Sequence, residues 1–585
     1  MRRSVTSART AGVASLLPLI LTVLAAVVAA VVALPAPASA TPPRSAAGVT
    51  TADPGAPARI VPVIADAAWS IYMNPRVLAT AKATYIGTTS TRGDIDITRV
   101  AHGGHKTDHT RLQRIDADMG GPRTPRTGAT ALGGTKTNGI MDDHASPSIL
   151  QLPDGRILVS WTGHTTIPVR YRISTRPDSI TSFGPVQTLA GSGIDTRRAV
   201  YTQIHHLAGE TYPYWVITRL RESDNRGNWY VARSRDLVRW TKAFQLTTNP
   251  YPKEVTKGWP YVKTSSDGQR TLDLAVTDGD PTNLRTNSLF HIRYRAGAFY
   301  RTDGTRIRTL GQVIGTGGKT PRPLDPRSGT LVHDGTAGQG WARVYDVRTG
   351  AGGEVAMAAT ANRAGTQPTE FKWFTASSGG WSASTVTSGP QWPTGYELTP
   401  GMSNRLYLIP NSAGTDGAQQ IQEWGVPDDA WTARTVATSP PGESMRNPVA
   451  PVAATPTGLP SGRISVLWMQ GIYHTYNDFN TRLMMETTGP APVTLTRSVN
   501  TTARKGYANV TVRVHQGVDG PGARGVTVRV VRTTPAGNSR SVVTRTSGTG
   551  LARASFWAPK GTRIKVEVAA RDGWGSAVAG TVTVR

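Results

Sequence analysis

The chain has 585 residues, no cysteine and a formal net charge of +27 at pH 7, from 65 Lys and Arg against 38 Asp and Glu. The absence of cysteine excludes a disulfide framework, thiolate catalysis and a cysteine-ligated metal, so stability must come from burial and hydrogen bonding. So basic a chain attracts polyanions in general, and charge alone does not choose among acidic polysaccharide, cell-wall polymer, nucleic acid and anionic lipid.

The N-terminus has the pattern of a secretory signal. Three arginines among the first nine residues precede an apolar run over residues 11–34, and Ala38-Ser39-Ala40 then supplies a small-x-small cleavage site. The apolar run is long enough to span a bilayer if it stays uncut, so a retained anchor is the alternative. We expect residues 1–40 to be a cleaved signal peptide, residues 41–59 to be a linker, and the mature protein to be secreted or attached to the cell surface.

Most of the remaining sequence alternates short β-rich runs with turns of Gly, Asp and Asn, and very little of it has helical period. The runs at 148–152 and 156–161, for example, flank the turn Pro153-Asp154-Gly155, and a second hairpin is expected over residues 261–276. These hairpins group into about seven modules of roughly 50–60 residues, near the upper end for four-stranded propeller blades. The sequence therefore predicts an all-β protein in which residues 60–486 form a seven-bladed β-propeller.

Two stretches of unusual composition interrupt this pattern. Residues 116–138 are rich in Gly, Thr and Pro with little apolar content, which indicates a surface insertion, and residues 487–492 have the composition of a linker. Beyond the linker, four short runs alternate apolar and polar residues, at 510–514, 526–531, 541–546 and 564–569. Residues 493–585 are therefore predicted to form an immunoglobulin-like β-sandwich, with a spacer or adhesive role.

Side chains capable of acid–base or anion-binding chemistry gather around the expected strands. His144 follows Asp142-Asp143 just before one predicted hairpin, and His164 follows its second strand. The next two modules add four further candidate residues at strand starts, strands or loops, namely Tyr201, Arg219, Tyr261 and Asp280. Asp142 and Asp143 are expected to cap turns or to hold His144 in place, in preference to binding a metal ion.

No other histidine pattern points to a metal centre. His102, His105 and His109 have loose spacing without a carboxylate pattern on a helix. His205 and His206 would point to opposite faces of a strand and cannot share one ligand site. We therefore expect no cofactor and no catalytic metal, while structural calcium in a propeller loop stays open, since oxygen ligands are too common to recognise without a spacing.

The run from Asp142-Asp143-His144 through Pro153-Asp154-Gly155-Arg156 to Gly163-His164 resembles the BNR-4 repeat family. Within that family it is similar to the seven-bladed propeller polysaccharide lyases that cleave ulvan and related uronate-containing polymers. The resemblance is clear over about residues 140–305 and weaker over the rest of the predicted propeller. It implies a secreted lyase that cleaves an acidic polysaccharide by β-elimination.

The resemblance also implies roles for individual residues. A lyase of this kind needs a cation to neutralise the uronate carboxylate, a base to remove the C5 proton and an acid to protonate the departing O4. Arg219 would be the neutraliser, because its fork binds both carboxylate oxygens. Tyr201 and His144 would transfer the protons, and His164 and Tyr261 would position the sugar.

Asp280 is a departure from the family pattern. It stands in Thr277-Asp278-Gly279-Asp280-Pro281, where related sequences usually have a histidine in place of Asp280. A carboxylate facing an anionic uronate is repulsive unless a cation intervenes. We interpret Asp280 as a substrate-binding position that indicates an altered substrate or a loss of activity.

Two other functions stay open. A sialidase-like hydrolase would use an arginine triad with a Tyr/Glu pair, whereas ordinary glycosidases need two carboxylates flanking the bond; Glu210 and Glu222 lie in hairpin or loop contexts and form no recognisable pair. A non-catalytic carbohydrate-binding propeller would suit Asp280 and the added sandwich.

Because no nucleic-acid-binding signature accompanies the charge, we expect an acidic polysaccharide as the partner, and no nucleic acid. We also expect a monomer with no stable membrane insertion once the signal is cleaved.

Overall fold

The computed structural model describes the chain from residue 58 to residue 584. Within that range it leaves out residues 103–105, 115–140, 223–226, 253, 256–257, 283–284, 337, 351, 364–367, 378–379, 390–394, 400–404, 411–417, 427–429, 454–463, 501–505 and 571–572. The predicted signal peptide, the predicted 116–138 insertion and all but the last two residues of the 41–59 linker lie outside the described residues.

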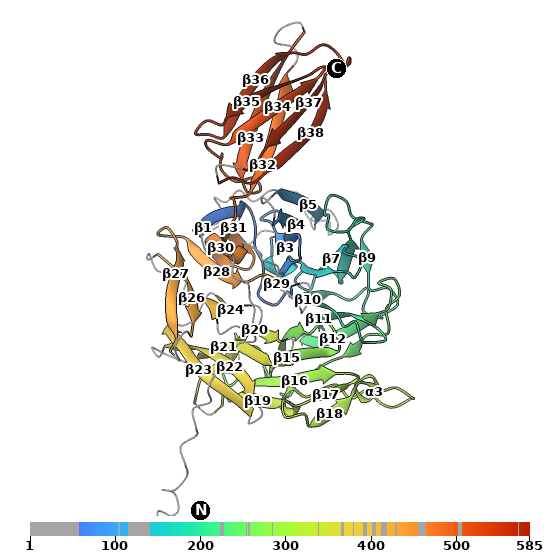
Figure 1. Ribbon diagram of the computed structural model, residues 1–585. Helices are drawn as coiled ribbons and strands as arrows, with labels where there is room; N and C mark the ends of the chain where they lie inside the picture. The colour runs from blue at the N-terminus through green and yellow to red at the C-terminus, as the bar shows by residue number, and fades with distance from the viewer. Residues whose placement is uncertain are drawn as a thin grey trace, which may run out of the picture. The chain divides into compact units, whose positions relative to one another are not determined.

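The described part of the chain consists almost entirely of β-strands (Figure 1), which confirms the predicted all-β class. Its helical segments are short, namely η2 (Asp143–Ala145), α3 (Leu310–Ile314) and η3 (Pro326–Ser328). No helix among the described residues has the length and apolar character needed to cross a membrane.

Between residues 59 and 487 the described strands form seven sheets of at least four strands each. In the first sheet the strands are hydrogen-bonded in the order β2 (Val77–Ala79), β3 (Ala83–Thr89), β4 (Asp94–Ala101) and β5 (Thr107–Arg114), and in the second sheet in the order β6 (Ser148–Gln151), β7 (Ile157–Trp161), β8 (Arg170–Ile173) and β9 (Gln187–Thr188). The third sheet consists of β10 (Ala199–His206), β11 (Tyr214–Arg221), β12 (Gly227–Ser234) and β13 (Phe244–Gln245). The fourth sheet consists of β14 (Tyr261–Ser266), β15 (Thr271–Thr277), β16 (Leu289–Arg295), β17 (Ala298–Tyr300) and β18 (Arg306–Thr309), and β19 (Thr330–His333) also pairs with β16. The two hairpins predicted from turn signals, β6–β7 and β14–β15, are both present.

The remaining three of these sheets continue the same pattern. They are β20 (Trp341–Thr349), β21 (Val355–Asn362), β22 (Thr369–Ser377) and β23 (Gly380–Gly389); β24 (Gly395–Leu398), β25 (Arg405–Ile409), β26 (Gln420–Gly425) and β27 (Thr432–Thr438); and β28 (Ser444–Val449), β30 (Ile464–Thr475), β31 (Asp478–Thr487) and β1 (Arg59–Ile64). The first strand of each sheet packs against the first strand of the next, from β2 and β6 through to β24 and β28.

The last sheet joins the two ends of this part of the chain. β1 pairs antiparallel with β31, so that Arg59 lies opposite Thr487, and the blue β1 lies beside the orange β30 and β31 in Figure 1. β29 (Val452–Ala453) also pairs in parallel with β2. Residues that are several hundred positions apart in the sequence are therefore held side by side.

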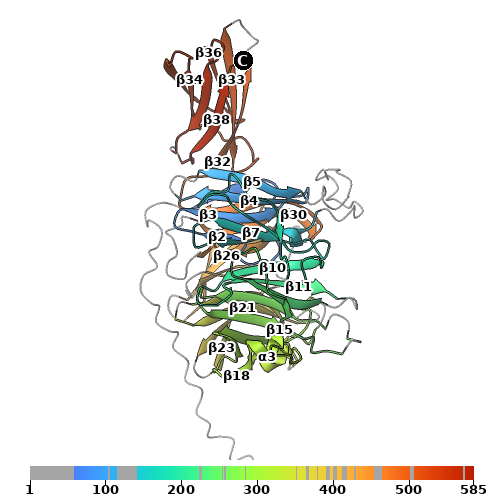
Figure 2. The ribbon, with the colours of Figure 1, turned by 90° about the vertical axis from the view of Figure 1, so that its right-hand side faces the viewer.

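Residues 493–584 form two further sheets that share one core (Figure 2). Their strands are β32 (Val493–Asn500), β33 (Tyr507–Gln516) and β36 (Leu551–Trp557) in one sheet, and β35 (Ser539–Arg545), β34 (Thr527–Thr533), β37 (Arg563–Val568) and β38 (Ala577–Thr583) in the other. The core is filled mostly by Val and Ala, and β33, β34, β35 and β37 coincide with the four strands predicted from alternation. Alternation of period two therefore located these four strands correctly.

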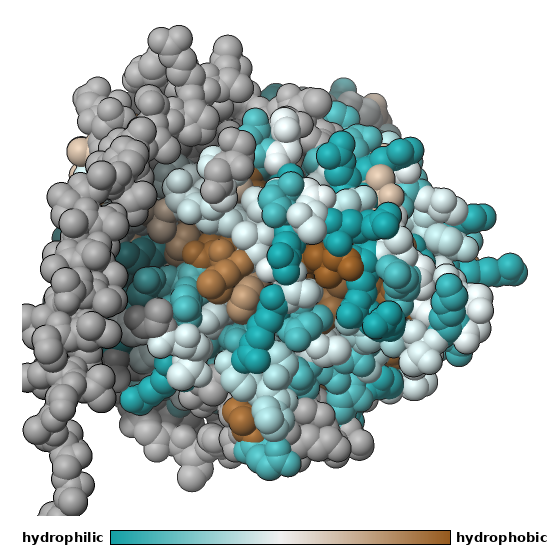
Figure 3. All heavy atoms as spheres, turned by 90° about the horizontal axis from the view of Figure 1, so that it is seen from below, coloured by the Kyte–Doolittle hydropathy of each residue, from teal (hydrophilic) through white to brown (hydrophobic). Residues whose placement is uncertain are grey.

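The face of the protein seen in Figure 3 is mainly hydrophilic. The apolar side chains visible on it form small patches that are separated by polar residues. This distribution agrees with burial of the large apolar residues in the clusters inside the sheets.

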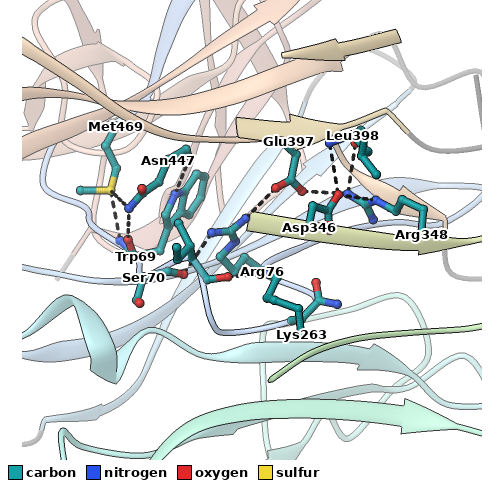
Figure 4. A network of polar contacts seen from close by, with 12 residues as sticks. Trp69, Ser70, Arg76, Lys263, Asp346, Arg348, Glu397, Leu398, Asn447 and Met469 are labelled. Carbon is teal, nitrogen blue, oxygen red and sulfur yellow. Dashed lines mark hydrogen bonds and ion pairs between the residues drawn. The ribbon is translucent and has the colours of Figure 1, made fainter. Parts of the chain in front are cut away.

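A buried network of charged side chains connects several sheets at their first strands (Figure 4). Arg76, just before β2, donates to Glu397 on β24 at 3.1 Å, and the two side chains are only 2% and 4% exposed. Arg348 on β20 donates to Glu397 at 2.7 Å and to Asp346 at 2.8 Å. Burial lowers the pKa of the neighbouring Lys263 on β14 to about 7, and burial together with Asp346 raises the pKa of Glu397 to about 7. Four sheets therefore depend on one set of mutually compensating charges.

Replacing Glu397 should be strongly destabilising. Glu397→Ala leaves the guanidinium groups of Arg76 and Arg348 buried without their shared acceptor, so the free energy of unfolding should fall by ~3–5 kcal/mol in a urea titration. Arg405→Ala is the control, because Arg405 is 61% exposed in its pair with Glu423, and such pairs contribute about 0–1 kcal/mol. Equal effects of the two substitutions would contradict a stabilising role for the buried network.

Candidate active site

One carboxylate holds both candidate histidines. Asp142 caps η2, and its Oδ1 accepts both the backbone N–H of His144 and, at 2.9 Å, the ring Nδ1 of His144. Its Oδ2 lies 3.0 Å from Nδ1 of His164, which follows β7. The two imidazole rings stack with their centroids 4.1 Å apart and their planes 10° from parallel. Asp142 therefore both caps the turn and fixes the histidines, as expected from the sequence for His144.

The stacked pair holds its charge unevenly. Burial lowers the pKa of His144, but the charges of Asp142 and of Asp143, whose Oδ1 is 2.9 Å from Nδ1, outweigh burial and raise that pKa to about 10. Burial and the positive charge of His144 lower the pKa of His164. At neutral pH, His144 is therefore an imidazolium and His164 a neutral imidazole. Because the Nδ1–H of His164 donates to Asp142, its lone pair is on Nε2.

The turn between β30 and β31 covers one side of this pair. Tyr476 contacts both histidines edge-on, with ring centroids 5.1 Å from His144 and 4.9 Å from His164. Its carbonyl accepts the backbone N–H of Asp143 at 2.9 Å, and the hydroxyl of Tyr473 donates to Asp143 Oδ2 at 2.5 Å. Tyr476 is 38% exposed, so solvent reaches the cluster on this side. Sequence reasoning missed both tyrosines, because they are more than 300 residues away from His144.

Tyr201 contacts His144 and has a strained backbone conformation. It lies on β10 at an irregularity between Val200 and Thr202, and it has φ of 62°, which is unusual for a residue with a large side chain. The Thr218 hydroxyl donates to the Tyr201 carbonyl at 2.7 Å. The Tyr201 ring centroid is 5.3 Å from that of His144. Residues held in such conformations concentrate at functional sites, so the strain is independent support for a functional Tyr201.

Arg219, on the neighbouring strand β11, lies among aromatic rings. Its Cζ is 5.9 Å from the Tyr201 ring centroid and 4.9 Å from that of Tyr261 at the start of β14. Tyr72 fills the space beside these two tyrosines, with centroid distances of 5.1 Å and 4.8 Å. Arg219 Nε is buried without a hydrogen-bond partner among the described residues. The buried guanidinium of Arg219 therefore keeps one N–H donor that no described group accepts.

Asp280 lies in the electrostatic reach of two arginines. It is 3% exposed, and its Oδ1 accepts the backbone N–H of Thr282 at 2.9 Å. Burial lowers the pKa of Arg219 and of Arg343 on β20, but nearby tyrosines and the charge of Asp280 outweigh burial and raise both values. The expected repulsion between Asp280 and an anionic ligand is therefore offset by two cations.

The structure thus brings the predicted site residues into one continuous cluster, which we call the His–Tyr–Arg cluster. Its members are His144, His164, Tyr201, Arg219 and Tyr261 from the sequence prediction, with Asp280 nearby, and Asp142, Tyr72, Arg343, Tyr473 and Tyr476 in addition. Three of the other histidines that the sequence analysis considered as metal ligands have partners outside this cluster. His102 contacts Thr84, His109 contacts Thr98, and His205 contacts Thr264. His105 lies outside the described residues.

Three of these side chains could also hold a metal ion. Asp142, His144 and His164 each offer one ligand atom, and these atoms lie within 4.8 Å of one another. Nitrogen and carboxylate ligands suit Zn²⁺. In the present arrangement both Nδ1 atoms bond Asp142, so a metal would have to replace these hydrogen bonds.

The unequal charge of the histidine pair can be tested by Asp142→Asn. Loss of the carboxylate should lower the pKa of His144 from about 10 towards its ordinary value of 6.5. In the unsubstituted protein, the stabilisation from this interaction is present below pH 6.5 and is lost as the pH rises through about 10. NMR titration of labelled histidine rings measures the shift. His515, which bonds Thr496 and Gly520 in the C-terminal sandwich, is the internal control, and an unchanged His144 titration would contradict the assignment.

Comparisons with known proteins agree with this architecture. A family model described as BNR repeat-containing family member matches residues 84–388. The chain is similar in structure to a PL25 ulvan lyase bound to -[GlcA(1-4)Rha3S]-, with a TM-score of 0.50 and 13% identity over 73% of this chain and 95% of that chain. Weaker similarities are to the polysaccharide lyase Uly1 (TM-score 0.40, 10% identity, 73% and 98% covered) and to the GH93 α-L-arabinofuranosidase of Fusarium graminearum with arabinobiose (TM-score 0.33, 15% identity, 58% and 91% covered). No curated protein sequence matches the chain.

Proposed function

Because the chain belongs to the BNR repeat-containing family, we propose that it is a polysaccharide lyase that cleaves a uronate-containing acidic polysaccharide by β-elimination. Its similarity in fold to an ulvan lyase supports an enzyme of this kind. The observation that carries the proposal is the continuous contact from the neutral His164 through His144 and Tyr201 to Arg219. A base, an acid and a carboxylate-binding cation lie within this one cluster.

We also propose the finer architecture and location that the sequence predicts. The seven sheets between residues 60 and 486 would be the blades of a β-propeller, and β1 would complete its last blade. Residues 493–585 would be an immunoglobulin-like sandwich after the 487–492 linker. Residues 1–40 would be a signal peptide that directs the protein out of the cytoplasm and is then cleaved. The secreted protein would act on its polysaccharide as a monomer.

Arg219 is proposed to neutralise the uronate carboxylate. Its unpartnered buried Nε can donate to a carboxylate oxygen, and this interaction makes the C5 proton more acidic. Arg343, which also has a buried Nε without a described partner, adds a second cation. Together they would offset Asp280, which therefore fits a substrate whose charge or substituent differs from that taken by relatives with histidine.

The charge states suggest how the protons move. Neutral His164 would remove the C5 proton at its free Nε2, and the Tyr201 hydroxyl would give its proton to O4 as the C4–O4 bond breaks. Burial raises the pKa of Tyr201 well above its ordinary value, which keeps it a proton donor. His144, an imidazolium beside Tyr201, would return a proton to the phenolate after the bond breaks. The family resemblance implies that His164 positions the sugar, whereas the neutral state of His164 favours the base role proposed here.

Incubation with ulvan and other glucuronate-rich polymers should release an unsaturated uronate, detected by its ultraviolet absorption.

Tyr201→Phe should lower kcat by about 10²–10⁴-fold while binding is retained, because the variant keeps the ring and loses the donated proton. Tyr171→Phe is the matched control, a buried tyrosine whose hydroxyl bonds Leu237 outside the cluster. Since no cofactor is proposed, EDTA should leave the rate unchanged. A fully active Tyr201→Phe enzyme, or no product across a broad panel, would refute the assignment.

The pH profile tests the base. Because His164 must be neutral and its pKa is lowered, kcat/KM should fall as the pH drops through a value below 6.5, and should be independent of this group above it. His164→Gln should remove this acid limb together with most of the activity. An acid limb above pH 6.5, or one that persists in the residual activity of His164→Gln, would assign the base to another group.

The products also separate the alternatives. A hydrolase would create a new reducing end without a double bond, and a binding-only propeller would retain the polymer without product. Glu210 bonds Tyr294 at 2.8 Å, and Glu222 bonds Tyr230 and Arg197, so neither is arranged as a catalytic partner of the other. These two glutamates therefore do not supply the carboxylate pair of a glycoside hydrolase.

A further inference from the structure

Two exposed aromatic side chains lie side by side on the C-terminal sandwich. Tyr507 on β33 and Trp557 on β36 are cross-strand partners and are 39% and 53% exposed. Their strand neighbours Ala508 and Phe556 face the core, so the two rings project from the outer face of the sheet β32–β33–β36. Two adjacent large rings on an outer face contribute nothing to the core and are typical of a binding surface.

The rest of this outer face carries groups that can bind a polar, extended ligand. Next to the aromatic pair, the Ser555 hydroxyl donates to Asn509 Oδ1 at 2.6 Å. Asn500 on β32 is the cross-strand neighbour of Asn509 on β33. Further along lie Arg553 opposite Thr511, and Arg513, both exposed. Arg553 is four residues from Trp557 along β36, which is about 13 Å. An extended chain lying along the strands would thus contact both the rings and the guanidinium groups.

The charge of the sandwich favours an anionic ligand. Residues 493–585 contain 15 Lys and Arg against 3 Asp and Glu. Arg532 adds positive charge beside the aromatic pair, with its Cζ 5.9 Å from the Trp557 ring centroid. A platform for neutral sugars would need the rings and hydroxyl partners but none of this charge.

We propose that the outer face of β32–β33–β36 binds an anionic polysaccharide. The face formed by Tyr507, Trp557, Asn509, Arg513 and Arg553 is named the aromatic platform. The apolar faces of sugar rings would stack on Tyr507 and Trp557, and carboxylate or sulfate groups would pair with Arg553 and Arg513. The aromatic platform is separate from the His–Tyr–Arg cluster and would keep the enzyme on its polymer between cleavage events. The retention of the enzyme on its polymer rests on the proposed function, whereas the binding of an anionic polysaccharide to the aromatic platform does not.

Binding is tested with the full chain carrying Arg219→Ala, which removes the proposed carboxylate contact in the His–Tyr–Arg cluster. The probe is ulvan immobilised in an affinity gel, with dextran as a neutral polymer and single-stranded DNA as another polyanion. In this background, adding Tyr507→Ala and Trp557→Ala should weaken ulvan binding at least about tenfold through loss of the stacking surface. Arg513→Gln with Arg553→Gln should weaken it too and reduce its salt sensitivity.

The matched control is Arg529→Gln with Arg545→Gln, which removes the same charge from exposed positions on β34 and β35 of the other sheet. These variants should bind ulvan within about twofold of the parent, because they leave the aromatic platform intact. Equal weakening by both arginine pairs, unchanged binding by the aromatic variants at an unchanged thermal midpoint, or equal retention of dextran or DNA would each overturn the proposal. A chain that binds ulvan through the aromatic platform but forms no unsaturated product would refute the lyase function alone.

Discussion

The pairing of β1 with β31 is the constraint on which the architecture of residues 59–487 depends. It fixes the beginning of this segment to its end, and the first strands of successive sheets then pack against one another. The buried charges around Glu397 are satisfied only in this arrangement, because Arg76 and Arg348 come from different sheets. The same closure carries Tyr476 to the histidine pair. The pairing of β1 with β31 therefore brings together segments that contribute to the His–Tyr–Arg cluster from both ends of this part of the chain.

Inside the cluster, a single carboxylate creates two chemically different histidines. Asp142 bonds both rings, but Asp143 Oδ1 also lies 2.9 Å from Nδ1 of His144, so the positive charge of the pair is held on His144. Two like groups with opposite protonation states are a common basis for acid and base roles in one site. The strained backbone of Tyr201 then presents its ring to His144 and Arg219 together. Geometry and electrostatics thus single out the same group of side chains.

Positive charge is used differently in the two parts of the protein. In the His–Tyr–Arg cluster, Arg219 and Arg343 are buried among tyrosines and face Asp280, so their charge is concentrated and directional. On the sandwich, the arginines are exposed and spread over a sheet face, where screening by salt is stronger. The first arrangement suits recognition of one carboxylate, and the second suits retention of a long anionic chain. The high net charge of the chain is consistent with both.

The sequence by itself determined the all-β class, the β6–β7 and β14–β15 hairpins, and the alternating strands of the sandwich, because turn residues and period-two alternation act over a few residues. It also selected His144, His164, Tyr201, Arg219 and Tyr261, through a family resemblance that covers about residues 140–305. Only the tertiary structure decided that these five side chains meet, that Tyr476 and Arg343 join them, and that His164 is neutral while His144 is charged. These properties depend on distances between distant segments and on burial, and neither quantity is encoded in local pattern.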